Sequence, residues 1–356
     1  MRQPVLDSRF REPGESWRPL RLHLNEAPWG PPAAAVRRIR DAAERANIYP
    51  IGETKRASEA AARHFGVSPR QVVLTTGVDE ATDLCLLELG RPITVRPGFN
   101  GFTDRAAALG LAARAFELSD YAAMPRALFE AVAPNDVVMV ASPNNPTGQR
   151  FRDEDLLAVL GSGAYLFLDE TYADFADGAP GLSWLERFDR LIVFKSFSKS
   201  FALGGLRLGC MIGDARTLER LRSRQEYYPV DRLALEGLIG ALAEEPDFPE
   251  RLAGRIRPLR EELAHQLRAC GLFERILDSS TNFVLAICRS AAEAKEIERF
   301  LAERAWILVA SAEPFGLAEG LRITVGNERE IEILGRALNS LGRQLQVEGA
   351  LVANRD

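Results

Sequence analysis

The chain has 356 residues, a formal net charge of −5 and 46% hydrophobic residues, which is enough for one large domain and a smaller one. The negative charge and the lack of a basic run argue against nucleic-acid binding, and no apolar stretch approaches the roughly 18 residues of a membrane span. Four cysteines and three histidines without metal-type spacing, and an N-terminus without an apolar signal core, predict a cytoplasmic protein with no metal site.

Short apolar runs alternate with helical patterns from about residue 70 to 215. The runs QVVLTT, PITVRP, DVVMVASP, AYLFLDE, RLIVFKS and RLGCMIG are typical of buried strands. Segments such as DEATDLCLLELG, which lie between these runs, place apolar residues at helical spacing. The alternation predicts an α/β domain with a largely parallel sheet and helices on its faces.

The pattern changes after residue 230. Charged helical stretches cover roughly 231–270, and then come NFVLAIC, a helix near 291–304, AWILVA, GLRITVG and a final helix. This order predicts a smaller α+β domain. We therefore divide the chain into an N-terminal arm (1–30), a large domain (31–230) and a small C-terminal domain (231–356).

Polar loops follow the predicted strands of the large domain. In open α/β sheets, ligands bind outside the carboxyl ends of the strands, so these loops are the first place to look for a site. They are TTGVDE, RPGFNGF, SPNNPTG, LDETYADF and SFSKSF. Each loop taken alone is also consistent with an ordinary turn, a helix cap or a core aromatic residue.

The loop SFSKSF carries Lys199, and Arg207 follows it eight residues later. A lysine becomes a nucleophile when burial or a neighbouring cation removes its proton. Ser196 and Ser198 can bind an anion beside it, together with Arg207. Asp169 ends a hydrophobic strand, where a carboxylate needs a cationic partner such as a protonated ring nitrogen.

The other loops add complementary groups. Gly77 permits a tight turn before a helix whose N-terminus attracts phosphate, and Phe99 can stack on a flat ring. Asn145 brings an amide to a stiff loop, and Tyr172 can hydrogen-bond a phenolate-type oxygen. Together the loops supply a phosphate cradle, a carboxylate, a stacking ring, an amide and a lysine. One ligand needs all of them: pyridoxal 5′-phosphate held as an imine.

With these motifs in order, the sequence resembles the fold-type I aminotransferases that depend on pyridoxal phosphate, within them the histidinol-phosphate aminotransferase-like branch. The resemblance runs through LHLNEAPWGPP, NIYP, TTGVDE, SPNNPTG, LDETYADF, SFSKSFALGGLRLG and GLRITVGNEREIE. It implies a large domain with a mostly parallel seven-stranded sheet flanked by helices. It also implies an enzyme of amino-acid biosynthesis that forms a homodimer with shared active sites.

The resemblance also implies roles for individual residues. Lys199 would form the Schiff base, Asp169 would pair with the ring nitrogen and Tyr172 with the ring oxygen. The remaining implied cofactor contacts are Gly77, Val78, Asp79, Phe99, Asn145, Ser196, Ser198 and Arg207, with Tyr49 reaching the phosphate of the neighbouring subunit. The implied substrate contacts are Arg322, which would clamp the α-carboxylate, and Asn25, Trp29 and Asn145.

Three positions depart from the branch pattern. An arginine that binds the substrate phosphate usually follows the strand ILV, but Val309 and Ala310 stand there in this sequence. Asp231 stands where an asparagine is expected, and Val78 replaces a smaller residue. Because the missing arginine removes an anchor worth about 1.5–3 kcal/mol, we expect a non-phosphorylated L-amino acid and a 2-oxo acid as substrates.

Other functions stay open. A histidinol-phosphate aminotransferase proper, or a decarboxylase or cyclase of the threonine-phosphate decarboxylase type, would use the same cofactor contacts. A non-enzymatic binder, such as the aminotransferase-like half of a transcription regulator, is disfavoured because only 20 residues precede RLHLNEAP. A dinucleotide-binding dehydrogenase is disfavoured because this sequence has no G-x-G-x-x-G after the first predicted strand. The side chain of the substrate, the amino acceptor and the pathway are not encoded in these motifs.

Overall fold

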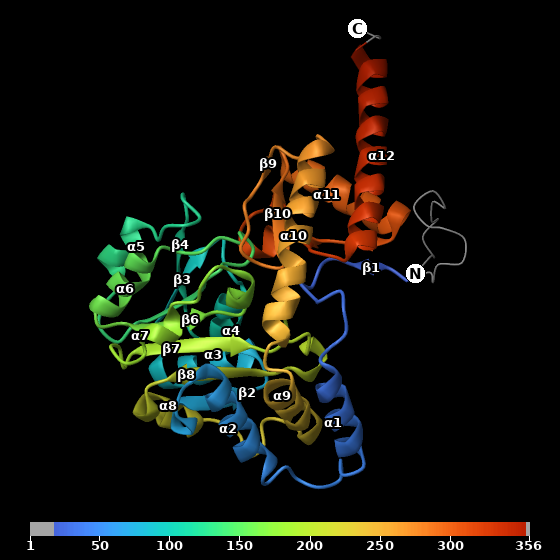
Figure 1. Ribbon diagram of the computed structural model, residues 1–356. Helices are drawn as coiled ribbons and strands as arrows, with labels where there is room; N and C mark the ends of the chain where they lie inside the picture. The colour runs from blue at the N-terminus through green and yellow to red at the C-terminus, as the bar shows by residue number, and fades with distance from the viewer. Residues whose placement is uncertain (1–17, 354–356) are drawn as a thin grey trace. The chain divides into compact units, whose positions relative to one another are not determined.

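The computed structural model describes residues 18–353, with side chains described up to residue 345 (Figure 1). Contacts within the chain divide it into two compact units. The larger unit comprises Trp29–Asn145 and Gln149–Gly254. The smaller unit comprises the chain up to Pro28, the short segment Pro146–Gly148 and the chain from Arg255 onward.

The larger unit contains a seven-stranded sheet in the order β2-β8-β7-β6-β5-β3-β4. Its strands are β2 (Val72–Thr75), β3 (Pro92–Arg96), β4 (Arg114–Glu117), β5 (Val137–Ala141), β6 (Tyr165–Asp169), β7 (Leu191–Ser196) and β8 (Gly209–Gly213). Only β8 runs antiparallel to its neighbours, β2 and β7. The prediction of a mostly parallel seven-stranded sheet is therefore confirmed.

Side chains of the central strands alternate between two apolar layers, because successive residues of a strand point to opposite faces. One layer contains Phe167 and Ile192 and is covered by α3 (Val78–Leu89), α4 (Gly101–Ala108) and α8 (Ala215–Arg222). The other contains Leu168 and Val193. It is covered by α1 (Ala33–Ala43), α2 (Glu53–Phe65), α5 (Arg126–Ala131), α6 (Asp153–Gly161), α7 (Gly181–Trp184) and α9 (Arg232–Glu244).

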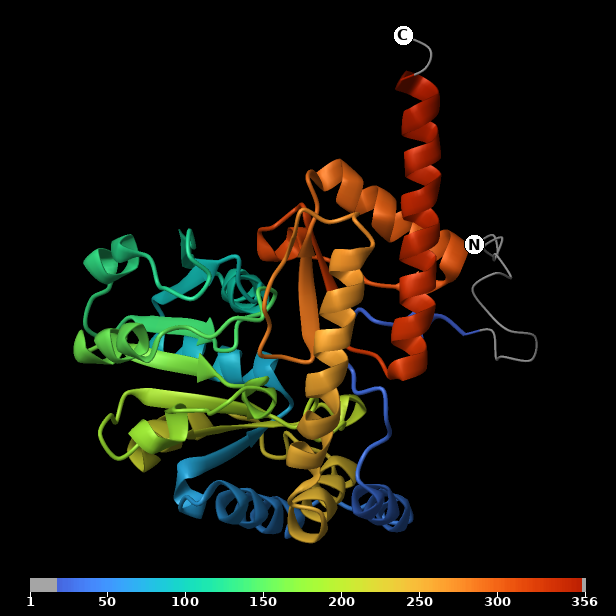
Figure 2. The same cartoon turned by 45° about the horizontal axis from the view of Figure 1, so that its top comes forward.

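Helix α9 belongs to the larger unit. Figure 2 shows it beside the blue helices α1 and α2, and every residue from Ala234 to Leu242 is buried. The sequence-based division placed this helix in the small domain by starting that domain at residue 231. The contacts of the chain instead start the main part of the smaller unit at Arg255.

The smaller unit has a four-stranded antiparallel sheet in the order β12-β13-β10-β9. These strands are β9 (Arg275–Ile276), β10 (Phe283–Ile287), β12 (Ala310–Ser311) and β13 (Gly320–Thr324), and β1 (Leu20–Arg21) pairs in parallel with β11 (Ile307–Leu308). The helices are α10 (Phe248–Ala269), which belongs to this unit from Arg255 onward, α11 (Ala291–Phe300), which continues as a π-helix (Leu301–Ala305), and α12 (Glu328–Ala353). Within residues 18–353, no helix combines the length and apolar character needed to cross a membrane.

Candidate functional site

Four loops meet at the carboxyl edge of the large sheet. The Ser142 N–H donates to the Asp169 carbonyl at 2.9 Å, and the Glu170 N–H donates to the Phe194 carbonyl at 3.0 Å. The Asn144 side chain donates to the Pro97 carbonyl at 3.0 Å. These bonds join the loop after β3 to the loop after β5, the loop after β5 to the end of β6, and the loop after β6 to β7, as expected for the carboxyl ends of neighbouring parallel strands.

Asp169 is the last residue of β6 and is only 4% exposed. Its carboxylate accepts the Thr171 N–H at 2.9 Å and the Thr171 hydroxyl at 2.5 Å. Burial raises the pKa of Asp169 to about 6, although the Thr171 hydrogen bonds favour the charged form. A buried carboxylate with these properties is suited to a cationic partner.

Gly77, Asp79 and Arg207 come together at the start of α3. Gly77 is the N-cap of this helix and adopts φ +90°, and a Cβ at this position would lie 3.1 Å from the Arg207 guanidinium. The Asp79 carboxylate lies 4.0 Å from the same guanidinium, and both side chains are more than half exposed. A helix N-terminus beside an arginine is a favourable place for an anion.

Lys199 lies in the loop between β7 and β8. Because β8 is antiparallel to β7, the loop is closed at its base, where the Phe197 N–H donates to the Leu208 carbonyl at 3.1 Å. Lys199 is half-buried, and its carbonyl accepts the Ala202 N–H at 3.1 Å. The Ser196 hydroxyl accepts the Ser198 N–H at 3.2 Å, so both predicted serines belong to the same turn.

The remaining strand-end residues are packed around this edge. Phe99 is half-buried, with its ring edge-on to Phe102 at 5.2 Å. The ring lies close over Gly101, where an added Cβ would come within 2.4 Å of it. Tyr172 and Asn145 are 5% and 6% exposed, and the half-buried Val78 is the first residue of α3.

Tyr49 lies on the surface of the larger unit. It is 70% exposed, and its ring stacks on Tyr228 at 4.9 Å. The buried Arg232 guanidinium donates to the carbonyls of Tyr49, at 3.0 Å, and Ile48, at 3.2 Å, and pairs with Glu53. Tyr49 is therefore held through its backbone while most of its ring is open to solvent.

In the smaller unit, Arg322 lies on β13 and is 6% exposed. Its guanidinium sits over two aromatic rings, 5.5 Å from the centre of Phe283 and 5.1 Å from that of Phe315. It also donates to the His23 carbonyl at 2.7 Å. The sequence motif did not identify these three neighbours, which come from segments far apart in the chain.

Asn25 is almost fully buried in the same unit, at 1% exposure and φ +54°. The backbone N–H of Asn25 donates to the Thr324 hydroxyl at 3.0 Å, and its backbone carbonyl accepts a hydrogen bond from the Asn282 side-chain amide at 3.0 Å. Trp29 is half-buried at the start of the larger unit. The motif SPNNPTG contributes the segment Pro146–Gly148 to the smaller unit. There the Gly148 carbonyl accepts the Ser280 N–H at 2.7 Å.

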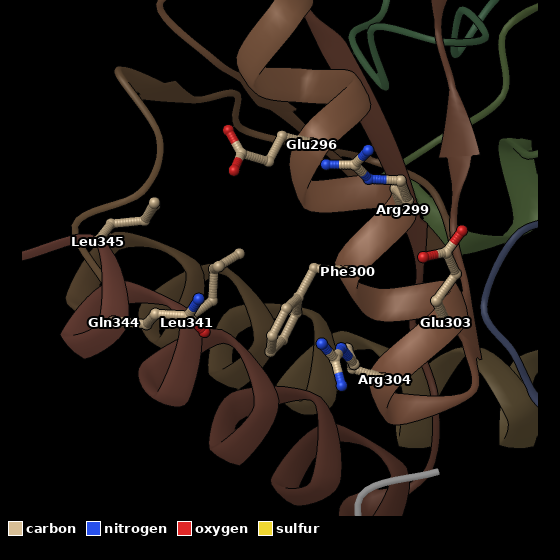
Figure 3. Close-up of a pocket in the computed structure, with 8 residues that line it drawn as sticks. All are labelled: Glu296, Arg299, Phe300, Glu303, Arg304, Leu341, Gln344 and Leu345. Carbon is tan, nitrogen blue, oxygen red and sulfur yellow. The ribbon is translucent and has the colours of Figure 1, made fainter. Parts of the chain in front are cut away.

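A separate hollow of about 410 Å³ lies among α11, the π-helix and α12 (Figure 3). Charged side chains, including Glu296, Arg299, Glu303 and Arg304, surround Phe300 in its wall. These four side chains are exposed, whereas ligand pockets are mostly apolar with a few convergent polar groups. We therefore place the candidate site at the carboxyl edge of the large sheet.

The chain is similar to known proteins over most of its length. The model of the family described as aminotransferase class I and II matches residues 19–338. The histidinol-phosphate aminotransferase of Granulibacter bethesdensis is 32% identical over 338 residues, which cover 91% of this chain and 90% of the relative. The corresponding enzyme of Rhodospirillum centenum is 33% identical over 351 residues, or 94% of each chain. A solved structure of histidinol-phosphate aminotransferase from Sinorhizobium meliloti in complex with pyridoxal-5′-phosphate is 26% identical, with a TM-score of 0.81 and 92% coverage of each chain.

Proposed function

The chain belongs to the aminotransferase class I and II family, and from that premise we propose that it transfers the amino group of a non-phosphorylated L-amino acid to a 2-oxo acid. That it is an aminotransferase dependent on pyridoxal phosphate follows from the family and from the relatives. The proposal concerns the identity of the substrate and the roles of single residues. The observation that best supports a non-phosphorylated substrate is Ala310, the residue on strand β12 that pairs with Arg322 on β13.

The residues at the carboxyl edge of the large sheet fit this cofactor. Asp169 is a buried carboxylate in need of a cation, and a ring nitrogen that carries a proton is one. At Gly77, a side chain would press against Arg207, so the glycine keeps open a space for an anion at the start of α3. The cofactor offers both a protonatable ring nitrogen and a phosphate, which match these two features.

We assign the cofactor contacts accordingly. Lys199 would hold the cofactor covalently through its aldehyde, Asp169 would pair with the ring nitrogen, and Tyr172 and Asn145 would bind the ring oxygen. Phe99 stacks on the ring. The phosphate is bound by Ser196, Ser198, Arg207 and the helix start at Gly77, Val78 and Asp79.

The bound cofactor supplies a ring that accepts electrons from a breaking Cα bond. When it is not joined to the cofactor, the Lys199 amine would be a positioned base that takes up and returns the Cα proton of the substrate. Arg322 would bind the α-carboxylate, because its planar guanidinium, packed over the rings of Phe283 and Phe315, has the fork geometry that suits a carboxylate. Asn25 and Trp29 complete the proposed substrate contacts.

The absence of a substrate phosphate is inferred from Ala310. This residue is the register partner of Arg322 across β12 and β13, and it stands where the histidinol-phosphate branch usually has an arginine. An alanine here offers no charge-assisted hydrogen bond to a phosphate, which would be worth about 1.5–3 kcal/mol. The second candidate is histidinol phosphate itself, because relatives of 32% and 33% identity carry that enzyme name.

A half-reaction screen separates the two candidates. Purified enzyme is mixed with each of a panel of amino acids and with histidinol phosphate, and the conversion of the bound cofactor to its amine form is followed by absorbance. We expect faster conversion with a non-phosphorylated amino acid. The matched variant Ala310→Arg should gain affinity for histidinol phosphate by about tenfold or more. A strong preference of the wild type for histidinol phosphate would contradict the proposal.

We further propose that the enzyme is a homodimer in which Tyr49 reaches the phosphate bound by the partner subunit. Five of the seven exposed large hydrophobic residues of the described chain lie in the two short segments 48–51 and 227–228. Ile51 and Tyr227 also line a hollow of about 790 Å³. Such a concentration of exposed apolar side chains is typical of an interface. Sedimentation at micromolar concentration should show a dimer. The variant Tyr49→Phe should weaken cofactor binding without dissociating the dimer.

We propose the cytoplasm as the compartment, which the unpaired thiols of all four cysteines support. Fractionation of the source cells with an antibody against the chain tests this directly.

A further inference from the structure

We propose that Arg232 is a positioning residue for the cofactor bound by the partner subunit, because it fixes the backbone that carries Tyr49. The inference rests on the proposed function at one point, the contact between Tyr49 and the phosphate in the partner's site. Arg232 was not among the residues that the sequence motifs singled out.

Tyr49 lies in the connection between α1 and α2, which does little to hold itself in place. Residues 44–52 contain no strand, so their carbonyl groups have no ladder of N–H donors. Of residues 48–51, only Pro50 is buried, whereas Ile48, Tyr49 and Ile51 are 52%, 70% and 77% exposed. Apolar burial therefore contributes little to fixing the chain here.

The Arg232 guanidinium supplies the missing donors. Its Nη2 donates to the carbonyls of Ile48, at 3.2 Å, and Tyr49, at 3.0 Å, and its Nε donates to that of Ile48 at 3.3 Å. Its Nη1 pairs with Glu53. The other oxygen of Glu53 accepts the Gly52 N–H at 3.2 Å. Two side chains thus bind three backbone groups of this segment.

Arg232 reaches the segment from a rigid helix. It is the first residue of α9 and is 6% exposed, and every residue from Ala234 to Leu242 is buried. The helix dipole disfavours a cation at this end, and burying a guanidinium is costly unless its N–H groups are paired. Because well-packed apolar residues often stabilise such a place at least as well, the fold alone gives little reason for an arginine here.

The ring of Tyr49 is held as well. It stacks on Tyr228, with ring centroids 4.9 Å apart and planes at 27°, and the Gln225 amide fastens the segment before Tyr228 to the Leu74 carbonyl of β2 at 2.8 Å. Within residues 18–345, the Tyr49 hydroxyl forms no hydrogen bond. A restrained, exposed tyrosine with an unused hydroxyl is preorganised for a ligand. Because this surface is the proposed subunit interface, that ligand would belong to the partner.

Mixed dimers test the proposal, because they separate the site of a subunit from that of its partner. Two differently tagged chains are combined, and one carries Lys199→Ala, so that only one site of each dimer can hold the cofactor covalently. In trans dimers, the Arg232 variant is on the Lys199→Ala chain, and Tyr49 of that chain serves the intact site. In cis dimers, the Arg232 variant is on the chain that keeps Lys199. The readout is the affinity of the intact site for pyridoxal phosphate, titrated by the absorbance of the cofactor joined to Lys199.

Two variants release the segment in different ways. Arg232→Lys keeps a charge beside Glu53 but lacks the fork that spans two carbonyls. Arg232→Met combined with Glu53→Gln removes both charges, which is better tolerated than the loss of one. The matched control is Glu236→Gln, one turn further along α9. Glu236 is also buried and ties α9 to α1 and α2 through two arginines, neither of which lies in residues 48–53.

We expect both Arg232 variants to weaken cofactor binding about five- to tenfold in trans dimers and to leave cis dimers within about twofold of the wild type. Glu236→Gln should stay within about twofold in both arrangements. Tyr49→Phe should weaken binding about tenfold in trans dimers, and adding Arg232→Lys should weaken it little further, because both changes act through the same hydroxyl. If one Arg232 variant forms no dimer, the other gives the same comparison.

Equal losses in cis and trans dimers, a loss in cis dimers alone, or no loss in either would overturn the proposal and leave Arg232 a structural role. Failure of the proposed function looks different, and the inference would fall with it. In that case Tyr49→Phe would itself have no effect in trans dimers, the wild type would form no dimer, or it would take up no pyridoxal phosphate.

Discussion

Replacing Asp169 by asparagine should stabilise the cofactor-free protein at neutral pH while weakening its hold on the cofactor. Burial raises the pKa of this carboxyl from 3.8 to about 6, so the folded chain binds the proton more tightly than the unfolded chain. Asparagine has no charge to bury. Its side-chain oxygen can still accept the two hydrogen bonds that Thr171 donates to Asp169.

The size of the effect follows from linkage. A pKa difference of about two units corresponds to about 3 kcal/mol, at 1.36 kcal/mol per unit. Between about pH 4 and pH 6, only the folded chain keeps the proton, so the wild type loses stability as pH rises. Above about pH 6, the whole penalty is present in the wild type and absent in the variant. The stability difference should therefore grow from near zero at pH 4 to about 3 kcal/mol at pH 7.

Urea unfolding of both cofactor-free proteins at a series of pH values measures this difference. A parallel titration with pyridoxal phosphate should show much weaker binding to the variant, because the charged partner of the ring nitrogen is gone. A stability difference that does not change with pH, or a variant less stable than the wild type at pH 7, would refute the reasoning.

Three further predictions concern neighbouring parts of the site. Gly77→Ala should weaken pyridoxal phosphate binding by about tenfold or more, because alanine is strained at φ +90° and its Cβ would press on Arg207. Titration of the cofactor-free protein with pyridoxal phosphate measures this loss of affinity. Arg232→Met should lower the free energy of unfolding by roughly 3 kcal/mol, because Glu53 then lacks its partner, and adding Glu53→Gln should recover part of the loss in urea unfolding. Arg322→Lys should raise the KM for amino acids about tenfold with a smaller change in kcat, because lysine keeps the charge but not the planar guanidinium; equal losses of both would point to misfolding.

The sheet was well predicted where its strands are buried on both faces. All six apolar runs identified in the large domain are strands, and their residues are buried almost throughout, so both faces of each strand are apolar in the sequence. The seventh, β4, has no such run: Arg114–Glu117 is largely exposed at the edge of the sheet. The start of the smaller unit was also placed differently, although a clue was present, because the sequence of α9 is apolar nearly all round and such a helix is normally buried.

The candidate site was predictable only in part. Asp169 ends an apolar strand and Lys199 stands in the loop after another, and the topology of a parallel sheet brings such strand ends to one edge. Their supporting residues carry no such local signal. Arg232 was not singled out by any motif, and only the packing of α9 beside α2 brings it to Tyr49. Likewise, the rings of Phe283 and Phe315 come to Arg322 from other strands and loops.

The loop that carries Lys199 begins and ends in strands that are hydrogen-bonded to each other. An added or deleted residue must therefore be absorbed within the loop, where it would displace Lys199, or it must slip one strand by a position and turn its side chains to the wrong layer. Several side chains of the loop are equally constrained, because Ser198, Lys199 and Arg207 are assigned to the cofactor and Phe201 is buried. Directed evolution of this enzyme should accordingly accept neither insertions in this loop nor substitutions at these positions.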